Sequence, residues 1–165
     1  MKRAMASVVL VVLLLSLVPA HVEAAGSLRV GLHTDESTLT PYSYVSGEPG
    51  YNLLLFVYDT LFSINEDNVP VPWLVKSYKW SDDGTVLTMD LHTNVKWHDG
   101  VALTANDVVF TYEYVKKYVH SRWTGPMEVM DEIKATGTHQ VVVKLRERSV
   151  GFLYQPLADQ PIMPK

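Results

Sequence analysis

A strand–turn–strand pattern near the middle of the chain most constrains its fold. Residues 77–80 and 86–92 are expected strands, and residues 81–84 (Ser-Asp-Asp-Gly) form a turn with glycine where a positive φ is needed. Apolar and polar residues alternate along the second strand, which therefore has one buried face. That face consists of Leu87, Met89 and Leu91, and the opposite face of Thr88, Asp90 and His92. Such a strand requires a core on one side of its sheet.

A helix with a strong start signal follows this hairpin. Asp99 and Gly100 mark a turn, and residues 104–107 then form a capping box, in which the Thr104 hydroxyl and the Asp107 carboxylate satisfy free amide groups. Apolar residues recur at helical spacing at Val108, Val109, Tyr112 and Val115. The basic residues 116 and 117 suit a helix C-terminus. The sequence predicts a helix that begins after position 104 and ends near position 117.

The remaining expected elements alternate between strand and helix patterns. In chain order they are a strand over 27–33, an irregular polar loop over 34–50, a buried helix over 51–62, a short helix over 127–133, a strand over 140–145 and a helical turn over 150–157. No internal repeat is present. The order of elements indicates a mixed fold of the α/β (α+β) class.

Residues 1–24 have the pattern of a secretory signal peptide. Two basic residues open the chain, residues 8–18 are apolar except for one serine, and Pro19 ends this run. Val22 and Ala24 then place small residues at the −3 and −1 positions of a cleavage site. The alternative is a membrane anchor, but a spanning helix needs about 20 apolar residues and this run is shorter. We therefore expect a signal peptide over 1–24 and a mature chain over 25–165.

The absence of cysteine narrows the class of protein. It excludes a disulfide framework, a thiolate metal site and a lipid attached to an N-terminal cysteine. An apolar content of 47% with 19% charged residues indicates a folded domain rather than a disordered chain. The net charge of −4 becomes −5 once residues 1–24, with two basic and one acidic residue, are removed, which argues against nucleic-acid binding. We expect a soluble, periplasmic or extracellular protein without a lipid anchor.

Residues capable of catalysis or metal binding occur, but not in functional patterns. The six histidines include no HExxH motif and no i, i+4 pair on an expected helix, so surface positions are favoured over metal ligation. The two aspartates at 82–83 could be mistaken for a pair of acid–base carboxylates, and the histidine and aspartate at 98–99 for a catalytic pair. A glycine follows each pair directly, which favours a turn at both places. No serine elbow or phosphate-binding loop is present. We expect no enzyme activity, no cofactor and no metal site.

Aromatic residues in polar stretches are candidates for ligand contacts. Tyr42, Tyr44 and Tyr51 lie in or beside the polar loop, and Trp123 lies beside a Gly-Pro break in the chain. Exposed aromatic rings often line ligand sites because they offer a large contact area with a polar tip. Core packing is the alternative interpretation. It is favoured for Tyr51, whereas both interpretations stay open for Tyr44 and Trp123.

The segment over 75–110 also resembles a family signature. Residues 81–84 and 96–110 match, nearly residue for residue, the hairpin and the His-Asp-Gly and helix run of the family 5 extracellular solute-binding proteins, the oligopeptide, dipeptide and nickel binders of ABC importers. Weaker similarities lie at 38–41, 57–62 and 161–165, and the departures are Val75, His92 and Thr40, where members usually have alanine, arginine and aspartate.

The resemblance implies part of a two-lobed periplasmic-binding-protein type II fold, which closes around its ligand by hinge motion. Family members are much longer, so residues 25–165 are expected to be the N-terminal part of the family domain and to bind no peptide alone. The implied function is substrate capture for an ABC importer. The implied partners are a peptide or related small solute and a membrane permease, with no nucleic acid, and the protein is expected to be a monomer.

The resemblance places ligand contacts at two positions. Tyr44, Val45, Ser46 and Gly47 resemble the stretch that runs beside bound peptide in peptide-binding members, and Trp123 stands where members often have an aromatic residue at the pocket. Within the family, a nickel chelate, haem or a sugar oligomer stays open as the ligand. Outside transport, the alternatives are a secreted hydrolase, for which no catalytic constellation is visible, and a sensor or chaperone.

Overall fold

The computed structural model of the chain describes residues 29–31, 40, 41 and 50–165. The chain divides into two units, Met1–Gly31 and Leu32–Lys165. The first unit is described only at residues 29–31. The second unit carries a four-stranded sheet, a two-stranded sheet and the helices in its described part.

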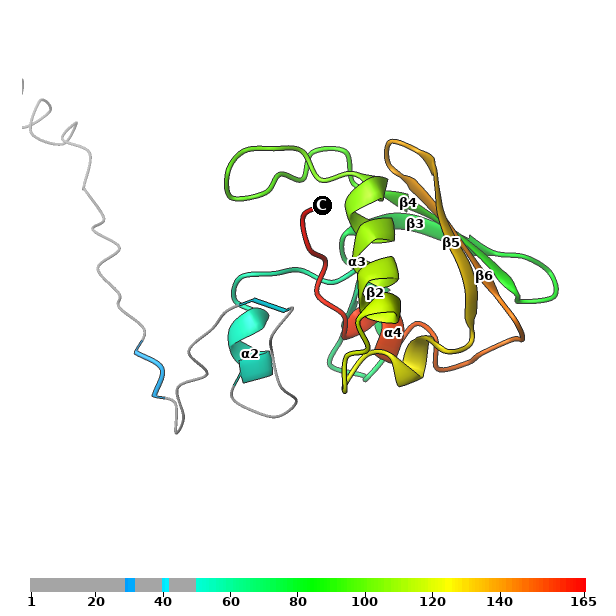
Figure 1. Cartoon of the computed structure of the whole chain (residues 1–165), viewed down its shortest axis with the longest axis horizontal. Coiled ribbons are helices and arrows are strands. Elements are labelled where there is room, and N and C mark those ends of the chain that lie inside the picture. Colours follow the sequence, from blue (N-terminus) through cyan, green and yellow to red (C-terminus); the bar gives the residue numbers. More distant parts are fainter. Residues whose placement is uncertain (1–28, 32–39, 42–49) are drawn as a thin grey trace, which may run out of the picture. The chain divides into compact units, whose positions relative to one another are not determined.

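The larger sheet is antiparallel, with the strand order β3-β4-β6-β5 (Figure 1). Its strands are β3 (Val75–Trp80), β4 (Val86–Leu91), β5 (Met130–Gly137) and β6 (Gln140–Leu145). Helix α3 (Ala105–Lys117) joins the β3–β4 hairpin to the β5–β6 hairpin and contacts β5 and β6. The expected strands over 77–80, 86–92 and 140–145 and the expected helix after 104 are confirmed.

The core of the second unit includes the face of β4 that the alternation predicts. Leu87 and Met89 are fully buried, and Leu91 is 2% exposed. Val108 and Tyr112 of α3 are also fully buried and belong to the same hydrophobic cluster. Antiparallel sheets of this kind keep one face on the core. The pattern read from the sequence therefore locates the main core correctly.

The turn predicted at residues 81–84 is confirmed, and Asp83 organises it. Gly84 has a φ of 70° and its N–H donates to the Ser81 carbonyl at 2.9 Å. Oδ1 of Asp83 accepts hydrogen bonds from the Ser81 hydroxyl at 2.5 Å and the Thr85 amide at 3.1 Å. These bonds, led by that from Ser81, lower the pKa of Asp83 to about 2. Asp83 is thus a turn residue, as predicted.

The start of α3 also follows the prediction. Thr104 donates to Oδ2 of Asp107 from its amide at 2.8 Å and from its hydroxyl at 2.9 Å, as part of a capping box. At the other end, Nζ of Lys116 donates to the Met130 carbonyl at 3.0 Å. This bond ties the last turn of the helix to the first residue of β5.

The helix expected over 51–62 is wrong beyond its first residues. Helix α2 spans only Gly50–Leu54, and Phe62 begins β1 (Phe62–Ile64), which pairs with β2 (Pro70–Pro72). The apolar run is not buried on all sides, because Leu55 is 45% and Phe56 is 72% exposed. At Phe62, the last residue of this run, pairing of β1 with β2 overrides the helical pattern, since the run also contains strand-prone residues.

The short helix expected over 127–133 is wrong as well. A 3₁₀ turn, η1, spans Gly125–Met127, and β5 begins at Met130. The register of β5 shifts between Met130 and Glu132, so Met130 and Ile133 are both buried although they are three positions apart. The buried residues of this irregular strand therefore have a spacing in the sequence that is typical of a helix.

The three remaining expected segments have different outcomes. The helical turn expected over 150–157 is confirmed at α4 (Gln155–Ala158). The strand expected over 27–33 is not found in its described part, because residues 29–31 are exposed and pair with no strand among the described residues. The polar loop expected over 34–50 lies outside the described residues, apart from positions 40 and 41 and Gly50, which begins α2.

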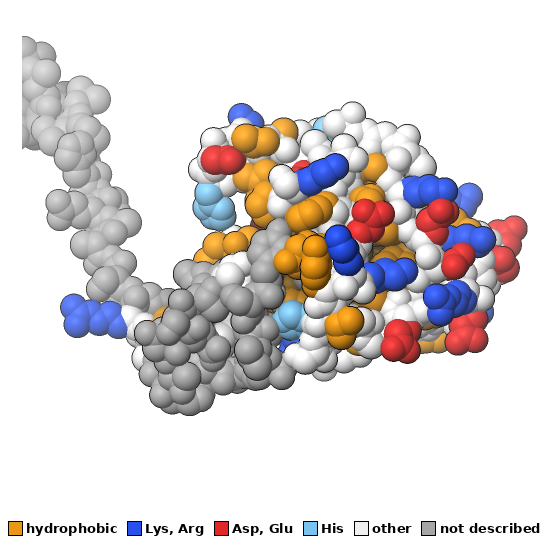
Figure 2. All heavy atoms as spheres, in the orientation of Figure 1, with side chains coloured by type: hydrophobic (Ala, Val, Ile, Leu, Met, Phe, Trp, Pro, Cys, Tyr) orange, Lys and Arg blue, Asp and Glu red, His pale blue; other side chains and the backbone are white. Residues whose placement is uncertain are grey.

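Basic and acidic side chains are interspersed on the side of the second unit that carries β5 (Figure 2). The exposed charged residues of α3 and β5 include Lys117, Asp131, Glu132 and Lys134. Nζ of Lys134 lies 2.6 Å from Oε1 of Glu132. Binding to a phosphate backbone requires a surface dominated by basic residues. This side therefore has no such surface.

We expect Gly84→Ala to lower the free energy of unfolding by about 1 to 2 kcal/mol. A φ of 70° disfavours an L side chain, and a Cβ at this position would lie 3.2 Å from Cγ and Cδ of Arg148. Urea unfolding followed by circular dichroism measures the loss. Gly100→Ala is the matched control, because Gly100 has a φ of 88° and no heavy atom within 4 Å of its Cβ position. A smaller loss at Gly84 than at Gly100 would contradict the expectation.

Candidate functional site

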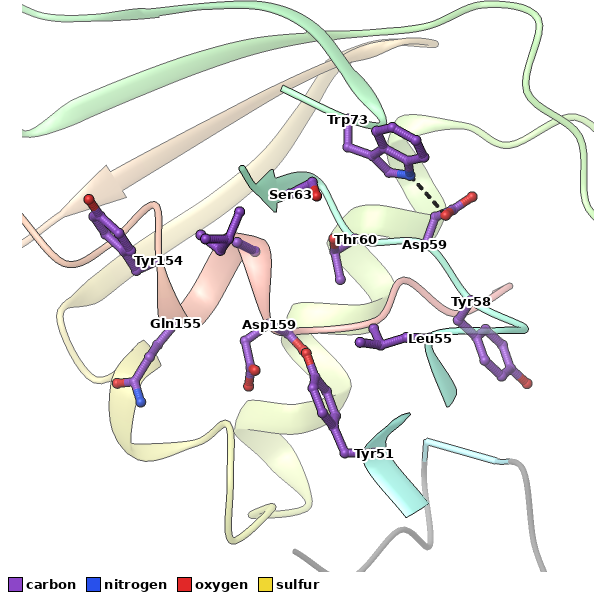
Figure 3. Close-up of a pocket in the computed structure, with 12 residues that line it drawn as sticks. Tyr51, Leu55, Tyr58, Asp59, Thr60, Ser63, Trp73, Tyr154, Gln155 and Asp159 are labelled. Carbon is purple, nitrogen blue, oxygen red and sulfur yellow. Dashed lines mark hydrogen bonds between the residues drawn. The ribbon is translucent and has the colours of Figure 1, made fainter. Parts of the chain in front are cut away.

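A cleft of about 550 Å³ lies between α2, the β1–β2 sheet and α4 (Figure 3). Among the described residues of its wall, aromatic and aliphatic side chains predominate, and two aspartates are the charged ones. The lining residues are Tyr51, Leu55, Tyr58, Asp59, Thr60, Ser63, Ile64, Trp73, Tyr154, Gln155, Ala158 and Asp159. The cleft therefore combines apolar contact area with a few polar groups, as ligand sites do.

Trp73 and Asp59 form one side of the cleft. The backbone N–H of Trp73 donates to the Leu61 carbonyl at 3.1 Å, which continues the pairing between β1 and β2. The next residue, Leu74, is buried, whereas Trp73 is 55% exposed. The indole Nε1 of Trp73 donates to Oδ1 of Asp59 at 2.8 Å (Figure 3). This bond holds the exposed ring in one orientation.

On another side of the cleft, Asp159 joins three side chains, and we call Tyr51, Arg122, Trp123 and Asp159 the Asp159 cluster. Arg122 donates from Nε to Oδ2 and from Nη2 to Oδ1 of Asp159, each at 2.6 Å. Trp123 Nε1 donates to Oδ2 at 3.0 Å. The Tyr51 hydroxyl donates to the Asp159 carbonyl at 3.2 Å, and the Arg122 guanidinium lies 4.0 Å from the centre of the Tyr51 ring. The bidentate pair neutralises the Asp159 carboxylate.

The Asp159 cluster keeps the phenol of Tyr51 protonated. Burial raises the pKa of Tyr51 above its ordinary value of 10.0, and the negative charge of Asp159 raises it further. The Arg122 guanidinium acts in the opposite direction, but its effect is smaller. The proton is needed for the hydrogen bond that Tyr51 donates to the Asp159 carbonyl.

We expect Tyr51 to make the protein lose stability at alkaline pH. Its folded pKa lies above the unfolded value of 10.0, so its contribution is complete below that pH and is lost as the pH rises through the folded pKa. Urea unfolding at about pH 9 and about pH 11 measures the change in the free energy of unfolding. Tyr51→Phe should reduce the fall between these two conditions. An equal fall in the wild type and the variant would refute this assignment.

Among the residues predicted to contact a ligand, Trp123 lies in the core. Its side chain is 1% exposed and stacks on His120, with the ring centres 4.1 Å apart. It reaches the cleft through its hydrogen bond to Asp159. A solute contact by Trp123 stays a prediction. Tyr42 and the other predicted contacts, Tyr44, Val45, Ser46 and Gly47, lie outside the described residues.

Tyr51, for which core packing was favoured, lies at the boundary between core and cleft. It is half-buried, packs against the hydrophobic core and also lines the cleft. The remaining cleft residues with aromatic or charged side chains were not predicted from the sequence as ligand contacts: these are Tyr58, Asp59, Trp73, Tyr154 and Asp159. For Trp73, the usable signal is a large aromatic residue at the end of a short strand next to a buried leucine.

The described part of the chain offers groups that can bind a ligand at the cleft. Over residues 29–31, 40, 41 and 50–165, no group of three or more His, Cys, Asp or Glu residues is placed to hold a metal ion. The cleft presents aromatic rings, hydroxyl groups and carboxylates. Such groups bind a ligand by stacking, hydrogen bonding and charge. No helix among these same residues has the length and apolar character needed to cross a membrane.

Solved structures that share this fold place the chain among the solute-binding proteins, and the described residues form part of their two-lobed periplasmic-binding-protein fold. A family model described as bacterial extracellular solute-binding proteins, family 5 middle, matches residues 69–165. The chain belongs to this family, as its hairpin and helix signature indicates.

Three comparisons give the extent of the similarity. The oligopeptide-binding protein AppA of Bacillus subtilis is 31% identical over 146 residues, which cover 87% of this chain and 26% of AppA. Its solved structure in complex with a nonapeptide has a TM-score of 0.67 and 26% identity, and covers 75% of this chain and 25% of that one. NikZ from Campylobacter jejuni in complex with Ni(L-His) has a TM-score of 0.61 and 29% identity, over 66% of this chain and 22% of that one. The chain spans about a quarter of the length of these relatives.

Proposed function

We propose that this chain belongs to the substrate-binding component of an ABC import system, which captures peptides outside the cytoplasmic membrane and delivers them to a permease. The observation that carries the proposal is the family match over residues 69–165. The similarity to AppA, whose solved structure is a complex with a nonapeptide, supports peptides as the solute. The relatives are binding proteins rather than enzymes, which supports a binding role without catalysis.

We also propose how the chain is divided into a signal peptide and a mature part, and where the protein works. Residues 1–24 act as a signal peptide that is removed, and residues 25–165 contribute the N-terminal part of the family domain. The short apolar run that ends at Pro19 supports cleavage. The protein then works in the periplasm or outside the cell as a soluble monomer, and the absence of cysteine supports a mature form without a lipid anchor.

Tyr44, Val45, Ser46, Gly47 and Trp123 are the proposed ligand contacts in this part of the protein. The first four precede α2, whose Tyr51 lines the cleft and belongs to the Asp159 cluster. Trp123 belongs to the same cluster. The bonds of Tyr51 and Trp123 to Asp159 support a site in which Trp123 acts together with α2.

The test uses the product of the whole reading frame that contains residues 1–165. Calorimetric titration with a nonapeptide is expected to show binding, and uptake of the same labelled peptide by the source bacterium is expected to fall when the gene is deleted. Export is measured by N-terminal sequencing of the mature protein. A folded protein that binds no peptide, together with unchanged uptake in the deletion strain, would overturn the proposed function.

A nickel chelate is a second candidate solute, because NikZ in complex with Ni(L-His) has the same fold over 66% of this chain. The same titration with Ni(L-His) separates the two candidates. Binding of Ni(L-His) without binding of the nonapeptide would favour the second candidate.

A further inference from the structure

The charges in the cleft are unbalanced. Its described lining residues include Asp59 and Asp159 and no lysine, arginine or histidine. Arg122 neutralises Asp159 through two hydrogen bonds of 2.6 Å. Asp59 has no such partner in the described part of the chain, where its only side-chain bond joins Oδ1 to the neutral indole of Trp73. Lys96 and His98 line a small neighbouring cavity together with Asp59, but neither forms an ion pair with it. Among the described residues, one carboxylate of the cleft is therefore without a paired cation.

An aromatic surface lies directly beside this carboxylate. The Trp73 ring is 55% exposed, and its hydrogen bond to Asp59 fixes its orientation. Tyr154, from the segment before α4, is 43% exposed and lines the same cleft. The face of an indole attracts cations more strongly than the ring of tyrosine or phenylalanine does. Because its ring is held before any ligand arrives, Trp73 loses little conformational freedom on binding.

We propose that the cleft binds a cationic group on an apolar stem, a guanidinium or ammonium such as an arginine or lysine side chain carries. The cation pairs with Oδ2 of Asp59, and the stem or the planar guanidinium lies against Trp73. An anionic group has no basic partner among the described lining residues and would be repelled by Asp59. A neutral ring could stack on Trp73 but would leave the Asp59 charge uncompensated. The assignment of this group to the imported solute rests on the proposed function.

The first experiment tests the cleft with small probes that do not depend on peptide binding. Benzamidine, benzamide and benzoate share one ring and differ in charge. The measurement uses the product of the whole reading frame, and the indole N–H signal that is missing in Trp73→Phe from a nitrogen–proton correlation spectrum identifies Trp73. Benzamidine is expected to shift the Trp73 signal with an affinity about tenfold above that of benzamide, and benzoate is expected not to shift it.

Asp59→Asn isolates the charge, because asparagine Oδ1 can still accept the Trp73 hydrogen bond. We expect this variant to bind benzamidine about tenfold more weakly and benzamide unchanged. Asp67→Asn is the matched control, since Asp67 is an exposed aspartate of the β1–β2 turn that does not line the cleft. Equal binding of benzamidine and benzamide, or benzamidine binding unchanged by Asp59→Asn, would overturn the proposal.

The second experiment links the cleft to the solute. Two pentapeptides are compared. Both have alanine at the four outer positions, and the central residue is arginine in one and its neutral isostere citrulline in the other. The arginine peptide is expected to bind about tenfold more tightly, and Asp59→Asn is expected to remove the difference. If neither peptide binds while benzamidine does, the proposed peptide function fails and the cation site stands. If both peptides bind equally, the cation site does not serve the solute.

Discussion

Trp123→Ala is expected to lower the free energy of unfolding by about 3 to 5 kcal/mol. Trp123 is among the largest fully buried side chains in the described part of the chain, and its ring stacks on His120. Removing it leaves a cavity and also removes the hydrogen bond to Asp159. Urea unfolding of the variant and the wild type, followed by circular dichroism, measures the loss.

Trp73→Ala is the matched control for this substitution. Trp73 is 55% exposed, so its loss is expected to cost less than about 1 kcal/mol. Trp123→Phe separates packing from hydrogen bonding, because phenylalanine fills much of the volume but cannot donate to Asp159. Losses of the same size in Trp123→Ala and Trp73→Ala would show that Trp123 is not part of the core.

The same variants test the proposed ligand contact of Trp123. If Trp123 only supports the core, the folded molecules of Trp123→Phe bind the solute with the wild-type affinity, and only the fraction of folded protein falls. If it contacts the solute or fixes a contact, Trp123→Phe weakens binding in protein that is fully folded. Affinity unchanged in the folded variant would remove Trp123 from the site.

The elements that could be predicted from the sequence have their signals in consecutive residues. The β3–β4 hairpin follows from alternation on both sides of a turn with Gly84, and α3 follows from the capping box at Thr104 and Asp107. Each of these signals depends on contacts within a few positions, so neighbouring residues are enough to determine the structure.

The two expected helices that are wrong depend on contacts with distant residues. The backbone at Phe62 is in a strand because Phe62 pairs with Pro72, and the backbone at Ile133 is in a strand because Ile133 pairs with Val143. An apolar run does not show whether a partner strand lies beside it. The register shift in β5 adds a spacing that a regular strand does not have. Pairing with distant strands therefore determines the conformation at Phe62 and Ile133, although the local pattern predicts a helix.

Most residues of the candidate site could not be predicted from the sequence, because the site also depends on contacts between distant residues. Asp159 meets Tyr51 across 108 positions and Trp123 across 36 positions, and no local pattern brings these residues together. Similarity to the family predicts a ligand contact at Trp123, which stays a prediction, and contacts at Tyr44, Val45, Ser46 and Gly47, which lie outside the described residues. The sequence thus indicated the class of site, and the fold was needed to find its charged and aromatic groups.

Asp159→Ala is expected to lower the free energy of unfolding by about 2 to 4 kcal/mol. The substitution leaves the Arg122 guanidinium and the buried Trp123 indole without their acceptor. A fully buried pair would give a larger loss, but the Arg122 and Asp159 side chains are 34% and 21% exposed, so water compensates in part. Glu132→Ala is the matched control, because Glu132 pairs with Lys134 at the surface, and it is expected to cost less than about 0.5 kcal/mol.

A double-mutant cycle decides whether the Asp159 cluster acts as a unit. Arg122→Met alone leaves the Asp159 carboxylate without its cation, whereas in the Asp159→Ala background that charge is already absent. We therefore expect Arg122→Met to cost about 1 to 3 kcal/mol less in the Asp159→Ala background than in the wild type. Urea unfolding of the four proteins gives this coupling energy. Additive losses would mean that the bidentate pair contributes no net stability, and the loss in Asp159→Ala would then come from Trp123 alone.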